Sequence, residues 1–115
     1  MNIKNIKTRC IKQNINKCEG VCKTYSKIAT QYALVLSECV EVKSFRTNIA
    51  LEGLGLEVEY MTDFLIEKAD GNYMVRECID RTLLLRPKNA KLLDMSRNYW
   101  KKHGVTDWGI VTNDK

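Results

Sequence analysis

The chain has 115 residues, of which 44% are hydrophobic and 29% are charged. This length and composition suit one water-soluble globular domain with a single modest core. No apolar run approaches the roughly 18 residues of a membrane span, and the N-terminus is too polar for a signal peptide. The sequence therefore predicts a cytoplasmic protein. Its five cysteines show no repeating spacing, which in a cytosolic chain indicates free thiols.

Positive charge is concentrated near the N-terminus. Residues 1–27 carry seven basic side chains against Glu19 alone, a net charge of +6, whereas the whole chain has +5. This asymmetry predicts a basic arm, residues 1–23, ahead of a folded domain, residues 24–115. The arm would contact an anionic partner, most simply the backbone of DNA; the alternative is a solvated basic tail. The basic residues in question are Lys4, Lys7, Arg9, Lys12, Lys17, Lys23 and Lys27. Isoleucines indicate that the arm packs partly on the domain: Ile3, Ile6, Ile11 and Ile15.

The first half of the domain reads as a helix followed by strands. Apolar residues at helical spacing predict an amphipathic helix over 25–39, with Thr24 as its N-cap. A strand is expected over 46–51. Two glycines within 53–55 indicate a turn, and a long second strand is expected over 56–67.

The second half alternates strand, helix and strand. A third strand is expected over 73–80, and the stretch 82–87 is a connection of undefined form. A second helix is predicted over 88–103, and a short last strand over 107–112. The order α-β-β-β-α-β predicts an α/β fold, a mixed sheet of about four strands flanked by two helices.

A turn at Asp70-Gly71 makes a hairpin that carries Asp63 on one strand and Glu77 on the other. Carboxylates on neighbouring strands can share a Mg²⁺ ion, which prefers oxygen ligands. Bound Mg²⁺ acidifies a water and offsets charge on a scissile phosphate. The hairpin is therefore half of a site for cutting nucleic acid. From the residues alone, carboxylates on a solvated face are the better interpretation.

Two segments carry a family resemblance: YMTDFLIEKADGNYMVREC, residues 60–78, and NYWKKHGVTDWGIVTND, residues 98–114. They resemble the PD-(D/E)XK nuclease superfamily, and most closely the N-terminal domain of TnsA-type transposon endonucleases. The likeness runs over roughly residues 5–113. It implies a single restriction-endonuclease-like domain, DNA as the partner, and Asp63 and Glu77 as catalytic, Mg²⁺-binding residues.

The chain departs from the family pattern at the site itself. Ile79 stands where the resemblance expects a catalytic Lys, Ala29 where it expects a helix Glu, and Thr62 where it expects a proline. These changes favour a degraded site. Three functions stay open: a DNA-binding protein of a phage or mobile element with weak or lost cleavage; an active Mg²⁺-dependent endonuclease; and a protein-interaction or inhibitor module, in contact with a protein of a recombination, packaging or defence complex.

Three smaller features have a structural and a functional interpretation. Cys10, Cys18, Cys22 and His103 could form a zinc set, but the spacing favours free thiols, and His103 more often caps a helix end. Trp108 suits either the core or base stacking. The basic residues of the second helix either form its wet face or extend a basic surface; they are Lys88, Lys91, Arg97, Lys101 and Lys102.

Overall fold

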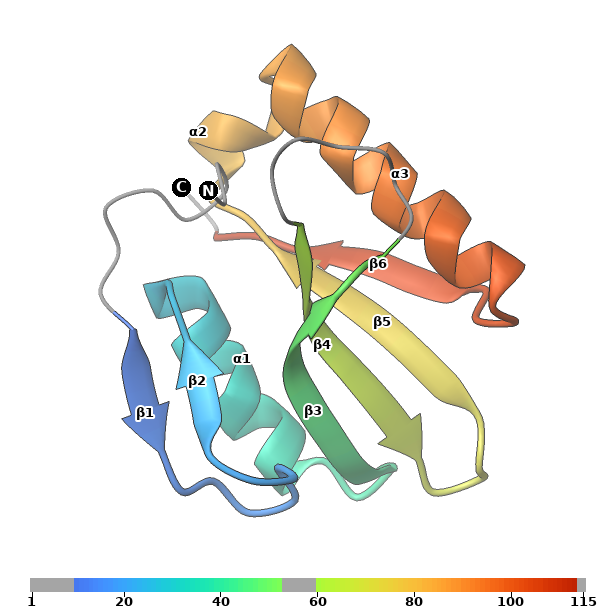
Figure 1. Cartoon of the computed structure of the whole chain (residues 1–115). Helices are drawn as coiled ribbons and strands as arrows, with labels where there is room; N and C mark the ends of the chain where they lie inside the picture. The colour runs from blue at the N-terminus through green and yellow to red at the C-terminus, as the bar shows by residue number, and fades with distance from the viewer. Residues whose placement is uncertain (1–9, 53–59, 114–115) are drawn as a thin grey trace.

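The computed structural model describes residues 10–52 and 60–113 of the chain. Figure 1 shows the elements in sequence. In chain order they are β1 (Ile11–Gln13), β2 (Cys22–Thr24), α1 (Lys27–Glu38), β3 (Val42–Ala50), β4 (Met61–Lys68), β5 (Tyr73–Cys78), α2 (Arg81–Leu84), α3 (Pro87–Lys102) and β6 (Asp107–Val111). No helix within these ranges is long and apolar enough to cross a membrane.

The main sheet has four strands in the order β3-β4-β5-β6. Strands β3, β4 and β5 pair antiparallel, whereas β5 and β6 pair in parallel. A parallel pair requires a crossover connection, which α2 and α3 supply. The predicted α/β domain with a mixed four-stranded sheet and a helix on each side is therefore confirmed. The separate two-stranded sheet β1-β2 was not predicted.

The two faces of the sheet form separate cores. On one face, α1 and the β1–β2 hairpin pack against Phe45, Phe64 and Ile66. On the other face, α3 packs against Leu65 and Val75. Phe64 and Leu65 are neighbours on β4, and successive side chains of a strand point to opposite faces. Figure 1 shows α1 and α3 on opposite sides of the sheet.

Helix α1 begins two residues later than predicted. Its N-cap is Ser26, whose hydroxyl accepts the N–H of Ala29 at 3.1 Å. The predicted cap, Thr24, is wrong: it ends β2, and its hydroxyl shares a 2.7 Å hydrogen bond with that of Thr30. Thr24 and Ser26 both precede the helix and could cap it. Because Thr24 pairs with β1 as part of β2, Ser26 is the cap.

The undefined connection contains a helical turn. Asp80 accepts the N–H of Thr82 at 2.8 Å and caps α2, so β5 ends at Cys78 and not at Asp80. Pro87 opens α3, where its missing N–H costs nothing. The Asp70-Gly71 turn is as predicted: Gly71 has φ +88° and Asp70 accepts the N–H of Asn72.

The strand ends also differ from prediction. Strand β3 begins at Val42 instead of residue 46, because its first residues already pair with the end of β4. The turn expected at 53–55 and the first part of the strand expected over 56–67 lie outside the described residues.

The described part of the basic arm is folded onto the domain. Strands β1 and β2 pair in an antiparallel hairpin, and Ile15 lies in the α1-side core. Ile11 is exposed. Ile3 and Ile6 lie outside the described residues. The hairpin runs to Thr24, so it crosses the predicted boundary between arm and domain.

Candidate functional site

The structure brings Asp63 and Glu77 together at the end of the β4–β5 ladder. Backbone pairing of these strands ends at Phe64 and Arg76. One step further, the N–H of Asp63 donates to Oε1 of Glu77 at 3.0 Å, and the N–H of Cys78 donates to Oδ2 of Asp63 at 2.7 Å. Each carboxylate thus accepts a backbone hydrogen bond from the opposite strand. The two acids continue the ladder where the strands diverge.

The divergence begins with a bend in β4. Thr62 bonds to Trp100 of α3, whereas Phe64 packs on the α1 side, so strict alternation is broken between them. On the neighbouring strand, Asn48 has φ +58° at the level of Asp63. A positive φ is uncommon for any residue other than glycine and marks a local irregularity. This bend turns Thr62 toward Glu77.

Glu77 accepts two further hydrogen bonds from side chains. Thr62 Oγ1 and Ser96 Oγ donate to Oε2 at 3.0 and 2.5 Å. The Glu77 side chain has no solvent-exposed surface. A buried carboxylate is tolerated when protein donors replace its water. Here the donors come from β4 and from α3, so Glu77 ties the helix to the sheet.

Two tryptophans complete this buried network. The indole N–H of Trp100 donates to Oγ1 of Thr62 at 2.8 Å, and that of Trp108 donates to Oγ of Ser96 at 3.1 Å. Each hydroxyl therefore accepts from an indole and donates to Glu77. Sequence reasoning missed Ser96. Its signal is a small polar residue within the apolar stripe of α3, one turn before Trp100.

The pair Asp63 and Glu77 would share a Mg²⁺ ion in competition with protein hydrogen bonds. Three of its carboxylate oxygens accept protein hydrogen bonds, and Asp63 is only 5% exposed. Mg²⁺ demands near-octahedral oxygen ligands and usually keeps several waters. Across the described parts of the chain, no three His, Cys, Asp or Glu side chains gather in a group that could hold a metal.

The positions that depart from the nuclease pattern are core positions. Ile79 is buried, and its N–H donates to the carbonyl of Val111. Ala29 lies in the α1-side core, whereas the Glu77 carboxylate faces α3. Ala29 and that carboxylate therefore lie on opposite faces of the sheet. A Glu at position 29 would not point toward Glu77.

The predicted basic residues of the arm fall into three groups. Lys12, Lys23 and Lys27 are exposed. Lys17 is half-buried, and its ammonium donates to the carbonyl of Cys39 at 2.6 Å, at the end of α1. Lys4, Lys7 and Arg9 lie outside the described residues.

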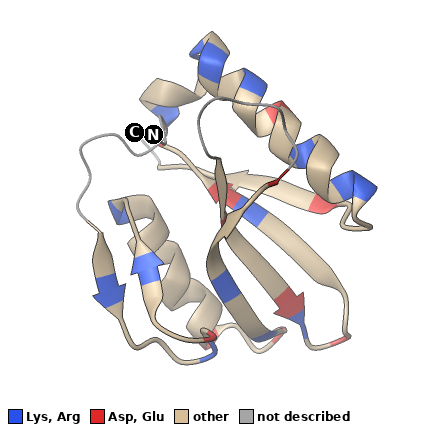
Figure 2. Cartoon of the chain, in the orientation of Figure 1, with Lys and Arg blue, Asp and Glu red and all other residues tan. Residues whose placement is uncertain are grey.

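A second concentration of positive charge lies on α3 and its entry. We call it the α3 basic face; its residues are Arg86, Lys88, Lys91, Arg97, Lys101 and Lys102, and all six are exposed. Asp94 is the only acid between residues 86 and 103, so this segment has a net charge of +5, against −5 for residues 28–85. Figure 2 shows blue positions along α3 with one red position among them.

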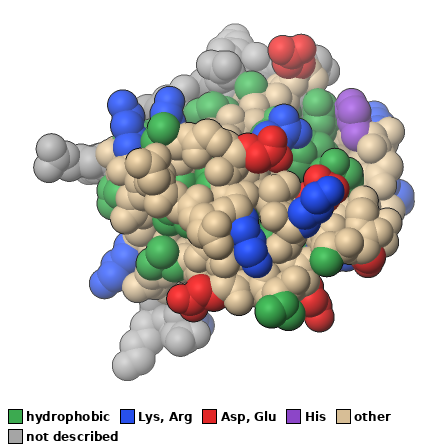
Figure 3. All heavy atoms as spheres, turned by 90° about the horizontal axis from the view of Figure 1, so that it is seen from below, with side chains coloured by type: hydrophobic (Ala, Val, Ile, Leu, Met, Phe, Trp, Pro, Cys, Tyr) green, Lys and Arg blue, Asp and Glu red, His purple; other side chains and the backbone are tan. Residues whose placement is uncertain are grey.

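The face of the molecule seen from below carries mixed charge. In Figure 3, which views the molecule from below, basic and acidic side chains are interspersed. Among the described residues, Lys43, Lys68 and Arg76 form ion pairs with acids, and these pairs lie away from the α3 basic face. No described acid pairs with the cations of that face.

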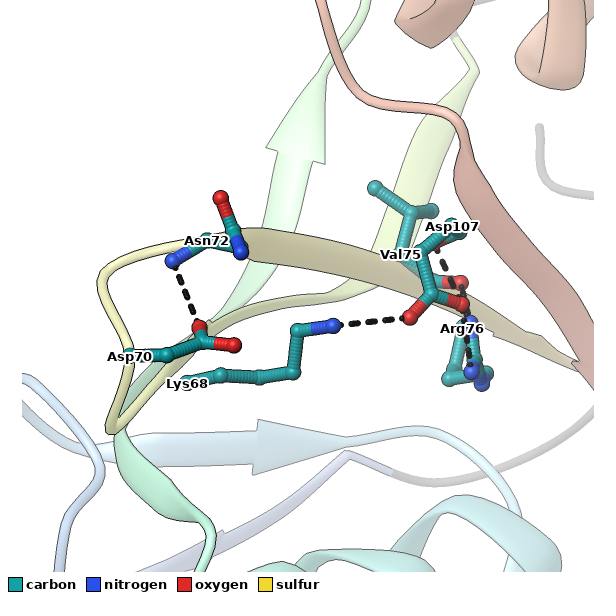
Figure 4. A network of polar contacts seen from close by, with 6 residues as sticks. All are labelled: Lys68, Asp70, Asn72, Val75, Arg76 and Asp107. Atoms are coloured by element: carbon teal, nitrogen blue, oxygen red, sulfur yellow. Dashed lines mark hydrogen bonds and ion pairs between the residues drawn. The ribbon is translucent and has the colours of Figure 1, made fainter.

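A cluster of ion pairs joins β6, the strand at one edge of the main sheet, to β4 and β5 (Figure 4). Asp107 of β6 accepts from Lys68 of β4 at 3.1 Å and from Arg76 of β5 at 2.8 Å. Arg76, and then Lys68, lower the pKa of Asp107 below its usual value. The cluster joins three strands and has a structural role.

The zinc set is not assembled among the described residues. None of the five cysteines is in a disulfide. Burial, and then the neighbouring Cys22 thiol, raise the pKa of Cys18 to about 12. His103 ends α3, where its Nδ1 lies 2.8 Å from the carbonyl oxygen of Tyr99 and its ring stacks on the tyrosine. This is the capping role that its position predicts.

Comparison with known proteins adds no relative: no protein-family model matches the chain, and no curated protein matches it at a significant level.

Proposed function

We propose that this protein binds DNA through the α3 basic face, on a nuclease-like fold whose cleavage activity is weak or absent. The observation that carries the proposal is the accumulation of six exposed cations on α3 and its N-cap, with a single acid among them and no ion pair to any described residue. Backbone phosphates are the polyanion that such a row of cations suits, and their neutralisation dominates non-specific affinity for DNA.

The dimensions of α3 agree with a contact along one backbone. The helix has 16 residues, which corresponds to about 24 Å of length. Phosphates of one DNA strand follow each other at intervals of about 3.4 Å of helix axis. A helix of this length can therefore reach several phosphates. Contacts to phosphate position a protein on DNA without reading its sequence, so we expect weak sequence preference.

Weak or absent cleavage is supported by the surroundings of the two acids. Glu77 is buried and accepts from Thr62, Ser96 and the backbone of Asp63. Ile79 occupies the position of the expected Lys and brings no acid–base group. Loss of such a group commonly lowers a rate by about 10²- to 10⁴-fold.

The test of binding is a salt titration of DNA affinity, measured by anisotropy of a labelled duplex. Lys88→Gln with Lys91→Gln should lower the log–log salt slope by about 1.8, since each lost phosphate contact lowers it by about 0.9. Lys43→Gln with Arg46→Gln removes the same charge from β3, where both residues are exposed, and should leave the slope unchanged. Equal effects of the two pairs, or no binding by the parent, would contradict the proposal.

The arm can be tested in the same assay by substitution. Deleting it would remove β1 and the core residue Ile15. Lys12→Gln with Lys27→Gln changes exposed residues only. A lower log–log salt slope in this double variant would show that the arm also contacts DNA.

The endonuclease alternative is tested by nicking of supercoiled plasmid with Mg²⁺ or Mn²⁺. We expect no metal-dependent nicking above the level of Asp63→Ala. Strong nicking by the parent, lost in Asp63→Ala, would establish the alternative.

One observation favours the protein-interaction alternative. Leu34, Val35 and Val40, at the end of α1, are 49%, 58% and 89% exposed. Exposed apolar groups of this kind mark interaction sites when they are contiguous. If the double variant Val35→Ser with Val40→Ser still binds DNA with the salt dependence of the parent, this apolar surface is not part of the DNA contact.

A further inference from the structure

A small cavity lies between the last turns of α3 and the start of β6. Its volume is about 280 Å³, and it is lined by Arg97, Asn98, Lys101, Val105, Thr106 and Trp108. The lining offers two cations, an aromatic ring, an amide and a hydroxyl, and includes no acidic side chain. This combination suits a ligand that has an anionic part and a flat part.

Trp108 presents a fixed ring to this cavity. Its indole N–H is already bound to Ser96 at 3.1 Å, and its ring packs against the α3-side core. The side chain is half-buried. Because the N–H already has an acceptor in Ser96, a ligand at Trp108 would meet the apolar ring and not a hydrogen-bond donor. A side chain already held in place loses little conformational entropy on binding, and nucleobases stack on aromatic rings of this kind without regard to sequence.

Arg97 and Lys101 supply the anion-binding part. They lie one helical turn apart, so they share a face of α3. Two features repel an anion at this place. They are the carboxylate of Asp94, one turn before Arg97, and the carbonyl groups at the C-terminal end of α3, which carry partial negative charge. Asp107 is next to Trp108 in sequence, but Lys68 and Arg76 form ion pairs with its carboxylate and offset its negative charge. With Asp107 offset by its own partners, Arg97 and Lys101 outweigh the carboxylate of Asp94, and the cavity mouth has a net positive charge.

We propose that this cavity binds one unpaired nucleotide of a DNA strand, with the base stacked on Trp108 and the adjoining phosphate held by Arg97 and Lys101. The volume of about 280 Å³ lies just below the range of about 300–1,000 Å³ that is usual for ligand pockets, so only a small group such as a single base and its sugar suits it. Asn98 and Thr106 can hydrogen-bond to the base edge or the sugar. The inference rests on the proposed DNA binding and adds a preference for single-stranded or frayed DNA.

The test compares an oligothymidylate strand with a duplex, each labelled and titrated with the full-length protein. Trp108→Leu removes the π-surface but keeps an apolar side chain. It should weaken single-strand binding by about 5- to 150-fold, which corresponds to about 1–3 kcal/mol of stacking per base, and leave duplex binding within a few-fold. Trp108→Phe also loses the bond to Ser96 but keeps a ring, so it should retain single-strand binding. Arg97→Gln with Lys101→Gln should weaken single-strand binding.

The outcomes separate this inference from the proposed function. Equal loss of single-strand and duplex binding in Trp108→Leu, or equal behaviour of the Leu and Phe variants, would show a structural role and overturn the inference. A parent that binds duplex in a salt-dependent way but not the single strand would overturn it while leaving the proposed function standing. A parent that binds neither would overturn both.

Photo-crosslinking keeps the test independent of mutant folding. A single strand that carries 5-bromodeoxyuridine, irradiated with the unmodified protein, should form an adduct on the peptide that contains Trp108. An adduct confined to other peptides would contradict the proposed site.

Discussion

Asp63 and Glu77 hold the diverging ends of β4 and β5 together through backbone hydrogen bonds: the N–H of Asp63 donates to Glu77, and the N–H of Cys78 donates to Asp63. In this arrangement the two acids stabilise the fold. The hydrogen bonds thus give both side chains a structural role.

Ser96→Ala should lower the free energy of unfolding by about 1–3 kcal/mol. The change removes one donor to the buried Glu77 carboxylate and leaves the indole N–H of Trp108 without its acceptor. Urea denaturation measures the effect. Ser37→Ala is the control, since that hydroxyl donates to a carbonyl at the exposed end of α1, and its effect should stay within about 0.5 kcal/mol. Equal losses in the two variants would argue against a special role for Ser96.

Millimolar Mg²⁺ should not raise the melting temperature of the parent more than that of Asp63→Asn. A ligand that binds only the native state stabilises it, but the Asp63 and Glu77 oxygens already accept protein hydrogen bonds. Differential scanning fluorimetry across a Mg²⁺ and Mn²⁺ series provides the measurement. A rise that saturates in the parent and disappears in Asp63→Asn would instead demonstrate a metal site at this pair.

The Asp107 cluster should contribute stability that disappears in acid. Arg76 and Lys68 lower the pKa of Asp107 below its usual 3.8, so the folded state favours the ionised form. The contribution is present above about pH 4 and is lost as the pH falls through the folded-state pKa. Asp107→Asn should therefore be less stable than the parent at pH 7, and the gap should close in acid.

Because the Asp107 side chain is 42% exposed, the effect at pH 7 should be below about 1 kcal/mol and should shrink in high salt. Asp94→Asn, an exposed position on α3, is the control. An Asp107 gap that persists unchanged at pH 2 would contradict the ion-pair explanation.

The cysteines should differ in their rates of alkylation at pH 8. With a pKa of about 12, Cys18 stays almost entirely in the unreactive thiol form, and Cys22 and Cys78 are buried. The exposed Cys10 should therefore react first with iodoacetamide, as peptide mass spectrometry would show. Labelling of Cys18 as fast as Cys10 would mean that the β1–β2 hairpin opens readily.

Local patterns predicted most of the fold. Apolar spacing located α1 and α3, and the Asp70-Gly71 turn set the hairpin that places Asp63 beside Glu77. The β1–β2 hairpin escaped prediction because its first strand is exposed throughout and has no alternation to read. Helix α2 escaped because four residues are too few for a helical period.

By itself, then, the sequence determined the order of the two longer helices and of the four strands of the main sheet, the meeting of two acids on one hairpin, and a strongly uneven distribution of charge. Only the tertiary structure decided what the acids contact and where the cations gather. Ser96 is 19 residues from Glu77 and 12 from Trp108 along the chain, and they meet because α3 crosses over the sheet to join β5 to β6 in parallel. Contacts of that range follow from packing, because no local period or turn signal records which side chains two distant elements will bring together.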